Sequence, residues 1–101
     1  MLILFDVLTS CNKEEELYTK EALISWTGDY AADGCGFYLT IDAKTYKPEN
    51  ENIIGDEFKS FDSSIKVLLK FNYLDKKVIY WCGFTGQQEM DGLKIISIEK
   101  L

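Results

Sequence analysis

Hydrophobic and polar residues alternate along two segments of the chain, which is the pattern of half-buried β-strands. Residues 35–42 and 65–73 show this alternation, and lysines occupy two of the polar positions in the second segment. The hydrophobic positions of the two segments are Phe37, Leu39, Ile41, Ile65, Val67, Leu69, Phe71 and Tyr73. Because a strand has a period of two residues, we expect these side chains to share one face of a sheet and form the core.

Turn and loop residues divide the remaining sequence into short strands. The apolar segment at residues 22–30 ends in a Gly-Asp turn signal. The segment Asp42–Lys44 favours a hairpin turn before a short strand that Pro48 ends. Asp75–Lys76 favours a further hairpin turn, followed by a return strand and a glycine-containing loop at residues 83–92.

The hydrophobic positions change phase in the last strand, where Leu93 and Ile95 give way to Ile96 and Ile98. An extra residue in a β-bulge produces such a shift. The body of the domain contains one short expected helix, at residues 56–61. A length of 101 residues allows one domain. Five to six short strands with one short helix predict an all-β fold, a small antiparallel OB-like barrel.

The charge of the chain disfavours two classes of partner. Seventeen acidic residues outnumber eleven basic ones, all of them lysines, and give a formal net charge of −6. Proteins that bind the negative backbone of DNA or RNA need a positive surface, and arginine most often makes paired hydrogen bonds to phosphate and guanine. We therefore expect no nucleic-acid partner and no direct binding to an anionic membrane surface.

The absence of histidine removes the common catalytic pairs and one class of metal ligand. Neither a Ser-His nor a Cys-His nucleophile can form, and no histidine can hold zinc. Acidic residues gather around Asp29 and Asp33 and at residues 49–52, but they lack the alternating ligand spacing of a calcium loop. We expect no catalytic residue, no metal and no cofactor.

Cys35 and Cys82 occur in similar surroundings, because each is followed by glycine and then phenylalanine. A disulfide between them in an oxidising compartment would close the loop between these two residues and contribute about 4 kcal/mol to stability. Two free core thiols in a cytosolic protein are the alternative. A redox or metal role is a third, although a C-x-x-C motif and a flanking histidine are missing.

Aromatic residues offer a second kind of candidate site. Strand alternation places Tyr38 opposite the Phe37-Leu39-Ile41 face and Trp81 opposite Tyr80. Exposed rings on an OB-like barrel can stack on a sugar or a base. We expect Tyr38 and Trp81 to be exposed and name them as candidate ligand contacts, with burial in the core as the alternative for most aromatic residues.

Cys11 follows Leu-Thr-Ser at residues 8–10, a lipobox-like sequence in which a small residue precedes a cysteine that becomes diacylated after cleavage. The preceding apolar stretch resembles a secretory signal, but Asp6 interrupts it and no basic residue precedes it. We interpret residues 1–20 as a remnant lipoprotein signal with an acidic tether, and residues 21–101 as the barrel domain. An N-terminal strand or hydrophobic tail of a cytosolic domain is the alternative.

Residues 22–101 combine an Asp-Gly-Cys-Gly turn, a Glu-Phe-Lys segment before a strand with alternating lysines, a later Cys-Gly pair and an isoleucine-rich end. This combination resembles small bacterial lipoproteins with an OB-like domain, the NigD-like proteins. The resemblance implies secretion, a small β-barrel and a disulfide between Cys35 and Cys82, and it implies no activity. The chain departs from the pattern where Phe58-Lys59 is followed by Ser-Phe-Asp-Ser-Ser.

These expectations describe a non-enzymatic lipoprotein domain of the cell envelope, periplasmic or on the outer surface, held at the membrane only by a lipid on Cys11. The leading function is a structural or protein-interaction module that offers an exposed strand edge to an envelope protein. The alternative is a module that binds a small ligand or glycan through Tyr38 and Trp81.

Overall fold

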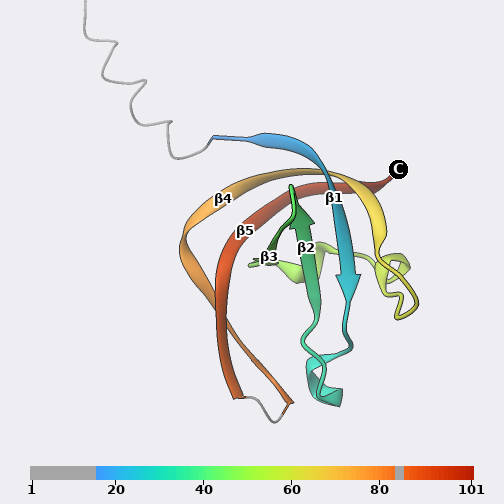
Figure 1. Cartoon of the computed structure of the whole chain (residues 1–101), viewed down its shortest axis with the longest axis vertical. Coiled ribbons are helices and arrows are strands. Elements are labelled where there is room, and N and C mark those ends of the chain that lie inside the picture. Colours follow the sequence, from blue (N-terminus) through green and yellow to red (C-terminus); the bar gives the residue numbers. More distant parts are fainter. Residues whose placement is uncertain (1–15, 84–85) are drawn as a thin grey trace, which may run out of the picture.

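The computed structural model describes residues 16–83 and 86–101, which form a closed five-stranded barrel (Figure 1). The strands are β1 (Tyr18–Trp26), β2 (Phe37–Ile41), β3 (Lys44–Pro48), β4 (Ile65–Cys82) and β5 (Gly86–Lys100). Their order around the barrel is β1-β2-β3-β5-β4, and pairing of β1 with β4 closes it. The chain is therefore an all-β, OB-like barrel, as the alternation predicts.

Two details of the barrel differ from the prediction. The contact of β3 with β5 is parallel, whereas the other four strand pairs are antiparallel. The expected helix at residues 56–61 is a single 3-10 turn, η4 (Asp56–Phe58). Its N-cap is Gly55, which makes no side-chain hydrogen bond to the turn, and burial of Phe58 fixes the segment instead. Two further 3-10 turns are η2 (Tyr30–Ala32) and η3 (Glu51–Ile53).

The barrel interior holds the hydrophobic positions of the alternating segments. The buried core residues are Ala22, Ile24, Phe37, Leu39, Ile41, Ile54, Phe58, Val67, Leu69, Phe71, Leu93 and Ile95. Six of the eight positions that the alternation assigned to one face are in this list, and Ile65 and Tyr73 pack against it while partly buried. The period of two therefore locates the core correctly in β2 and β4.

The first strand begins at Tyr18, three residues before the expected start of the domain. The Tyr18 ring stacks on Phe71 at 5.7 Å and meets Tyr73 edge-on at 4.8 Å, measured between ring centroids. The Asn72 side-chain amide also donates a hydrogen bond of 2.5 Å to the carbonyl of Glu16. These contacts with β4 extend β1 into the segment that the sequence assigned to the tether.

The prediction of a hairpin turn at Asp75–Lys76 is wrong, because both residues lie within β4, which continues to Cys82. Tyr73 pairs with Leu93 and Lys77 with Asp91, so the three residues between Tyr73 and Lys77 face one residue of β5 and form a bulge. Residues 86–92, which the sequence pattern assigns to a loop, belong to β5. The turn-forming residues Asp75 and Lys76 thus lie at a bend in the long hairpin of β4 and β5 and do not end a strand.

The phase change in the last strand is a β-bulge, as predicted. Lys70 pairs with Ser97 and Phe71 pairs with Ile95, so Ile96 has no partner in β4 at this register shift. Ile96 is exposed, whereas Ile98 on the far side of the bulge packs against the core. The inserted residue restores the hydrophobic face of β5 to the barrel interior.

The turn between β2 and β3 holds two residues in left-handed backbone conformations, Asp42 with φ 51° and Ala43 with φ 69°. Ile41 pairs with Lys44, so this is a two-residue hairpin turn, in which glycine is favoured. Alanine in this region costs about 1 kcal/mol relative to glycine. We expect Ala43→Gly to raise the free energy of unfolding by about 0.5–1 kcal/mol. Urea unfolding of the variant checks this, and an equal or lower midpoint would contradict it.

Candidate functional site

The ends of β4 and β5 beside their connection form a two-stranded ribbon, which we define as residues 77–82 and 86–91. The pairing of β1 with β4 stops at Phe71, and the pairing of β3 with β5 is confined to Gly92 and Leu93 on β5. Within the described residues, the ribbon strands pair with each other and with no third strand. Figure 1 shows the ribbon extending past the ends of β2 and β3.

The two faces of the ribbon differ in composition and burial. Tyr80 and Cys82 are buried on the inner face, which packs over the outside of the β2–β3 hairpin. Ile79 and Trp81 alternate with them and lie on the outer face, where their exposed fractions are 56% and 63%. Their partners on β5 are Glu89 and Gln87. Two large apolar side chains therefore stand side by side on the solvent face of the ribbon.

A disulfide fixes the tip of the ribbon. Cys35, in the loop before β2, is bonded to Cys82 at the end of β4, with a Cα–Cα distance of 4.9 Å. The predicted pairing of these two cysteines is confirmed in the structure. The bond joins the loop between β1 and β2 to the end of β4, so the ribbon cannot swing away from the barrel without breaking it.

A buried lysine anchors the space beneath the ribbon. The side chain of Lys47, on the outer side of β3, has an exposed fraction of 0%. Its Nζ donates hydrogen bonds to the carbonyls of Cys35 and Phe37, the latter at 2.7 Å, and lies 3.2 Å from a Glu51 carboxylate oxygen. The other Glu51 oxygen accepts a hydrogen bond of 2.9 Å from the Phe37 backbone. The burial cost of the ammonium group is thus met by three oxygen partners.

Three tyrosines enclose this ion pair. The Lys47 Nζ lies 4.4 Å from the ring centroid of Tyr38, 4.7 Å from that of Tyr80 and 5.2 Å from that of Tyr30. The Tyr38 hydroxyl donates to the Tyr80 hydroxyl at 3.2 Å, and the Tyr30 hydroxyl donates to Glu51 at 2.5 Å. We call these five residues, Tyr30, Tyr38, Lys47, Glu51 and Tyr80, the polar cluster. It links η2, β2, β3 and η3 to the ribbon.

The titration behaviour of the polar cluster follows from its burial. Desolvation lowers the pKa of Lys47, and the neighbouring Glu51 opposes this shift. Desolvation raises the pKa values of Tyr30 and Tyr38 far above 10, and the hydrogen bonds to Glu51 and Tyr80 add to the rise. No buried side-chain nitrogen or oxygen among the described residues lacks a hydrogen-bond partner. The hydrogen bonds and the ion pair of the cluster therefore hold the inner face of the ribbon in place.

The raised tyrosine pKa values predict loss of stability at alkaline pH. Unfolded Tyr30 loses its proton near its ordinary pKa of 10.0, whereas the folded protein keeps it. The folded state then binds more protons, so the stability present below pH 10 falls as the pH rises further. The lowered pKa of Lys47 acts in the opposite direction, but the two large tyrosine shifts outweigh it. We expect the free energy of unfolding to fall less steeply with rising pH in Tyr30→Phe than in the wild type.

Urea unfolding at pH 8, 10 and 11 measures this decline, and absorbance at 295 nm follows tyrosine ionisation. Tyr18→Phe is the matched control, because it removes a tyrosine hydroxyl outside the polar cluster. Equal declines in the wild type and in Tyr30→Phe would contradict the prediction.

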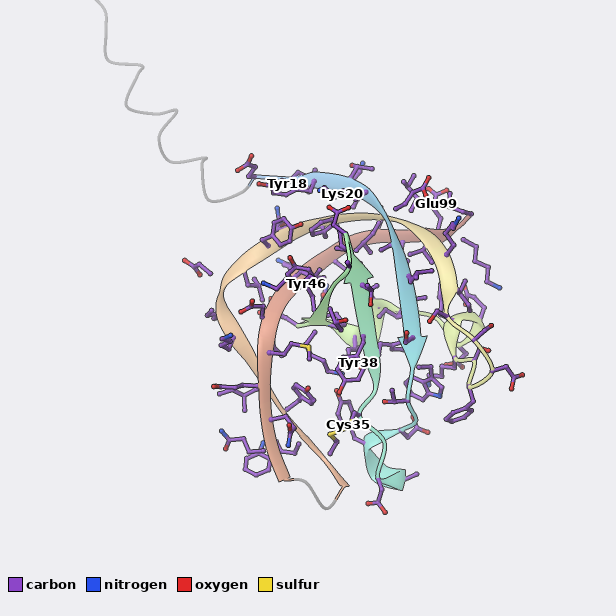
Figure 2. The ribbon with its side chains drawn as sticks, viewed as in Figure 1. Tyr18, Lys20, Cys35, Tyr38, Tyr46 and Glu99 are labelled. Carbon is purple, nitrogen blue, oxygen red and sulfur yellow. A yellow bond between two sulfur atoms is a disulfide. The ribbon has the colours of Figure 1, made fainter. Side chains whose placement is uncertain are left out.

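Tyr38 and Trp81 do not form one exposed patch. Trp81 is exposed as expected, but Tyr38 is half-buried and contacts Tyr80, whose side chain points to the inner face of the ribbon. OB folds bind oligonucleotides and oligosaccharides on the face of strands 2 and 3 and on adjoining loops. In this chain the ribbon covers Tyr38 and Lys47, which are outward-facing residues of that surface. Figure 2 shows Tyr38 between Cys35 and Tyr46.

Sequence reasoning missed most of the polar cluster. Lysine is almost always exposed unless it is paired, so the alternation at residues 44–48 gave no reason to bury Lys47. The four-residue spacing of Lys47 and Glu51 is the one local signal, but their ion pair lies between a strand and a 3-10 turn. Cys11, the predicted lipidation site, lies outside the described residues.

The described residues contain no group of three cysteine, histidine or carboxylate side chains arranged to hold a metal ion. They also contain no helix with the length and apolar character needed to cross a membrane. Comparison with known proteins adds no relative, because no protein-family model, curated protein or solved structure matches the chain.

Proposed function

We propose that this domain is a non-enzymatic interaction module of the cell envelope, which presents the outer face of its ribbon to a protein partner. One observation carries the proposal: Ile79 and Trp81 are both more than half exposed on a ribbon that is fixed from beneath. Tryptophan is enriched among the residues that dominate binding energy at protein interfaces. Glu89 and Gln87 beside them provide polar groups for the rim of such an interface.

The rigidity of the ribbon favours this use. Binding costs conformational entropy when a surface must be ordered first, and a preorganised surface avoids much of that cost. The disulfide and the polar cluster hold the inner face, so the outer face keeps one shape with or without a partner. The strand edges of the ribbon, which pair with no third strand in the described structure, suit an extended segment of the partner that adds as another strand.

An envelope location and a lipid anchor at Cys11 are part of the proposal. A disulfide persists in oxidising compartments, which supports export. With Cys35 and Cys82 paired, Cys11 is the odd cysteine, and it follows a small residue as lipidated cysteines do. Metabolic labelling of the native full-length protein with an alkyne fatty acid tests the anchor. Label that is lost in Cys11→Ser supports it, and an unlabelled wild-type protein would reject it.

Site-specific photo-crosslinking in the native host tests the interaction surface. A photoreactive residue replaces Trp81 in one strain and Ile96 in a control strain, because Ile96 is exposed on β5 but lies outside the ribbon. We expect a discrete crosslinked species from position 81 that Ile79→Asp abolishes, and none from position 96. A species of twice the chain mass would identify a second copy as the partner. Absence of any product from position 81 would overturn the proposal.

A further inference from the structure

The end of the barrel beside the β2–β3 turn carries a hollow of about 490 Å³, which we call the barrel mouth. Its lining includes Lys44, Tyr46, Tyr73, Leu74, Lys77 and Asp91. This volume lies within the range of roughly 300–1,000 Å³ found for small-molecule sites, and the mouths of β-barrels are a common place for them. In Figure 2, Tyr18, Lys20 and Tyr46 lie toward this end, away from Cys35.

Aromatic rings form one side of the mouth. The ring centroids of Tyr46 and Tyr73 lie 5.4 Å apart, and both rings are partly buried against the core. Phe71, which is fully buried, meets Tyr73 edge-on at 4.9 Å, and Tyr18 meets it from another side at 4.8 Å. These contacts hold the tyrosines in place, so the mouth offers a fixed aromatic surface.

Paired charges lie beside these rings, with the Lys44 Nζ 5.2 Å from the ring centroid of Tyr46. One Asp91 oxygen lies 2.7 Å from the Lys44 Nζ, and the other lies 2.9 Å from the Lys77 Nζ. Hydrogen bonds from the two lysines lower the pKa of Asp91 to about 2, so it is ionised at any physiological pH. Lys76 lies 4.0 Å from Glu49. The mouth therefore offers hydrogen-bond donors and acceptors whose charges are matched in ion pairs.

We propose that the barrel mouth binds a neutral carbohydrate, with a pyranose ring against Tyr46 and Tyr73 and its hydroxyl groups on Lys44, Lys77 and Asp91. The apolar face of a sugar ring suits an aromatic surface, and its hydroxyls both donate and accept hydrogen bonds. An anionic ligand would have to displace Asp91 from its two lysines, and an apolar ligand would remove these ion pairs from water without offering them a hydrogen bond. The inference does not depend on the protein partner of the ribbon.

An NMR titration of the folded, oxidised protein tests the site. The probes are neutral hexaoses of glucose, mannose, xylose and N-acetylglucosamine, with a sulfated hexaose as the anionic comparison. We expect at least one neutral hexaose to shift the backbone amide signals of Tyr46, Tyr73 and Asp91 in a saturable manner. The signals of Tyr38 and Trp81 should stay in place.

The variant Asp91→Asn keeps the side-chain size and removes the charge that organises the two lysines. We expect it to weaken binding of that hexaose about tenfold or more, as loss of charge-assisted hydrogen bonds does. Asp42→Asn is the matched control, because Asp42 pairs with Lys20 at 2.9 Å and does not line the mouth. The affinity of Asp42→Asn for that hexaose should equal that of the wild type. Circular dichroism should show that both variants are folded.

Four outcomes would overturn the inference. The first is that no neutral hexaose shifts the mouth signals at millimolar concentration. The second is tighter binding of the sulfated hexaose than of every neutral one. The third is a response centred on Trp81, and the fourth is an affinity that Asp91→Asn leaves unchanged. In either case the sugar would bind elsewhere. None of these outcomes bears on crosslinking at the ribbon.

Discussion

Replacing both Cys35 and Cys82 by alanine should lower the free energy of unfolding by about 4 kcal/mol. The bonded residues are 47 positions apart, and a cross-link of that span removes about this much chain entropy from the unfolded state. Domains of this size have only about 5–15 kcal/mol of stability in total. The double variant is the right comparison, because a single substitution would leave a free thiol beside the ribbon.

Urea unfolding of the oxidised wild type, the reduced wild type and the double variant measures this effect. Cys11→Ala is the control, because Cys11 takes no part in the bond between Cys35 and Cys82. We expect this variant to leave the unfolding midpoint unchanged. Hydrogen exchange adds a local measurement: amides of residues 77–82 should lose protection in the double variant before those of β1 do. A loss of stability below about 1 kcal/mol would show that the polar cluster alone holds the ribbon.

Replacing Lys47 by alanine should cost about 3–5 kcal/mol, the usual cost of removing one partner from a buried ion pair. The substitution leaves Glu51 without its ammonium partner and leaves the Cys35 and Phe37 carbonyls short of a donor. It also empties the space among the rings of Tyr38 and Tyr80. The effect therefore combines an uncompensated charge, lost hydrogen bonds and a cavity.

Two comparisons separate these causes. Lys47→Met fills most of the space without a charge, and combining it with Glu51→Gln removes the isolated carboxylate as well. We expect the double variant to be more stable than Lys47→Met alone. Lys20→Ala breaks an exposed ion pair with Asp42, and its stability should stay close to that of the wild type. Similar stability losses in Lys47→Ala and Lys20→Ala would contradict the role assigned to the polar cluster.

The disulfide and the polar cluster hold the same element, so their effects should not add. Lys47 donates to the carbonyl of Cys35, which carries one of the bonded sulfur atoms. Once the bond is absent and the ribbon loosens, Lys47 gains water as a partner and its removal costs less. A triple variant that combines all three substitutions measures this coupling by chemical denaturation. Additive losses would show that bond and cluster act independently.

The sequence alone determined the local features of the barrel. Alternation in residues 37–41 and 65–73 located the core, because side-chain direction in a strand depends only on position along it. The phase change at Ile96 located a bulge for the same reason. The cysteine pair was predicted from similar flanking residues and from the resemblance to NigD-like lipoproteins, and the structure contains that bond.

Only the tertiary structure decided what surrounds Lys47, Asp75 and Tyr38. Asp75 lies in a bend because β5 continues to pair with β4 beyond it, which the turn-forming residues themselves do not reveal. That bend carries the ribbon over β2 and β3, so Tyr38 lies against Tyr80 and Lys47 meets Glu51 away from solvent. The burial of a side chain depends on the packing of segments that are distant in the sequence. The partners of a buried polar residue are therefore visible only in the folded structure.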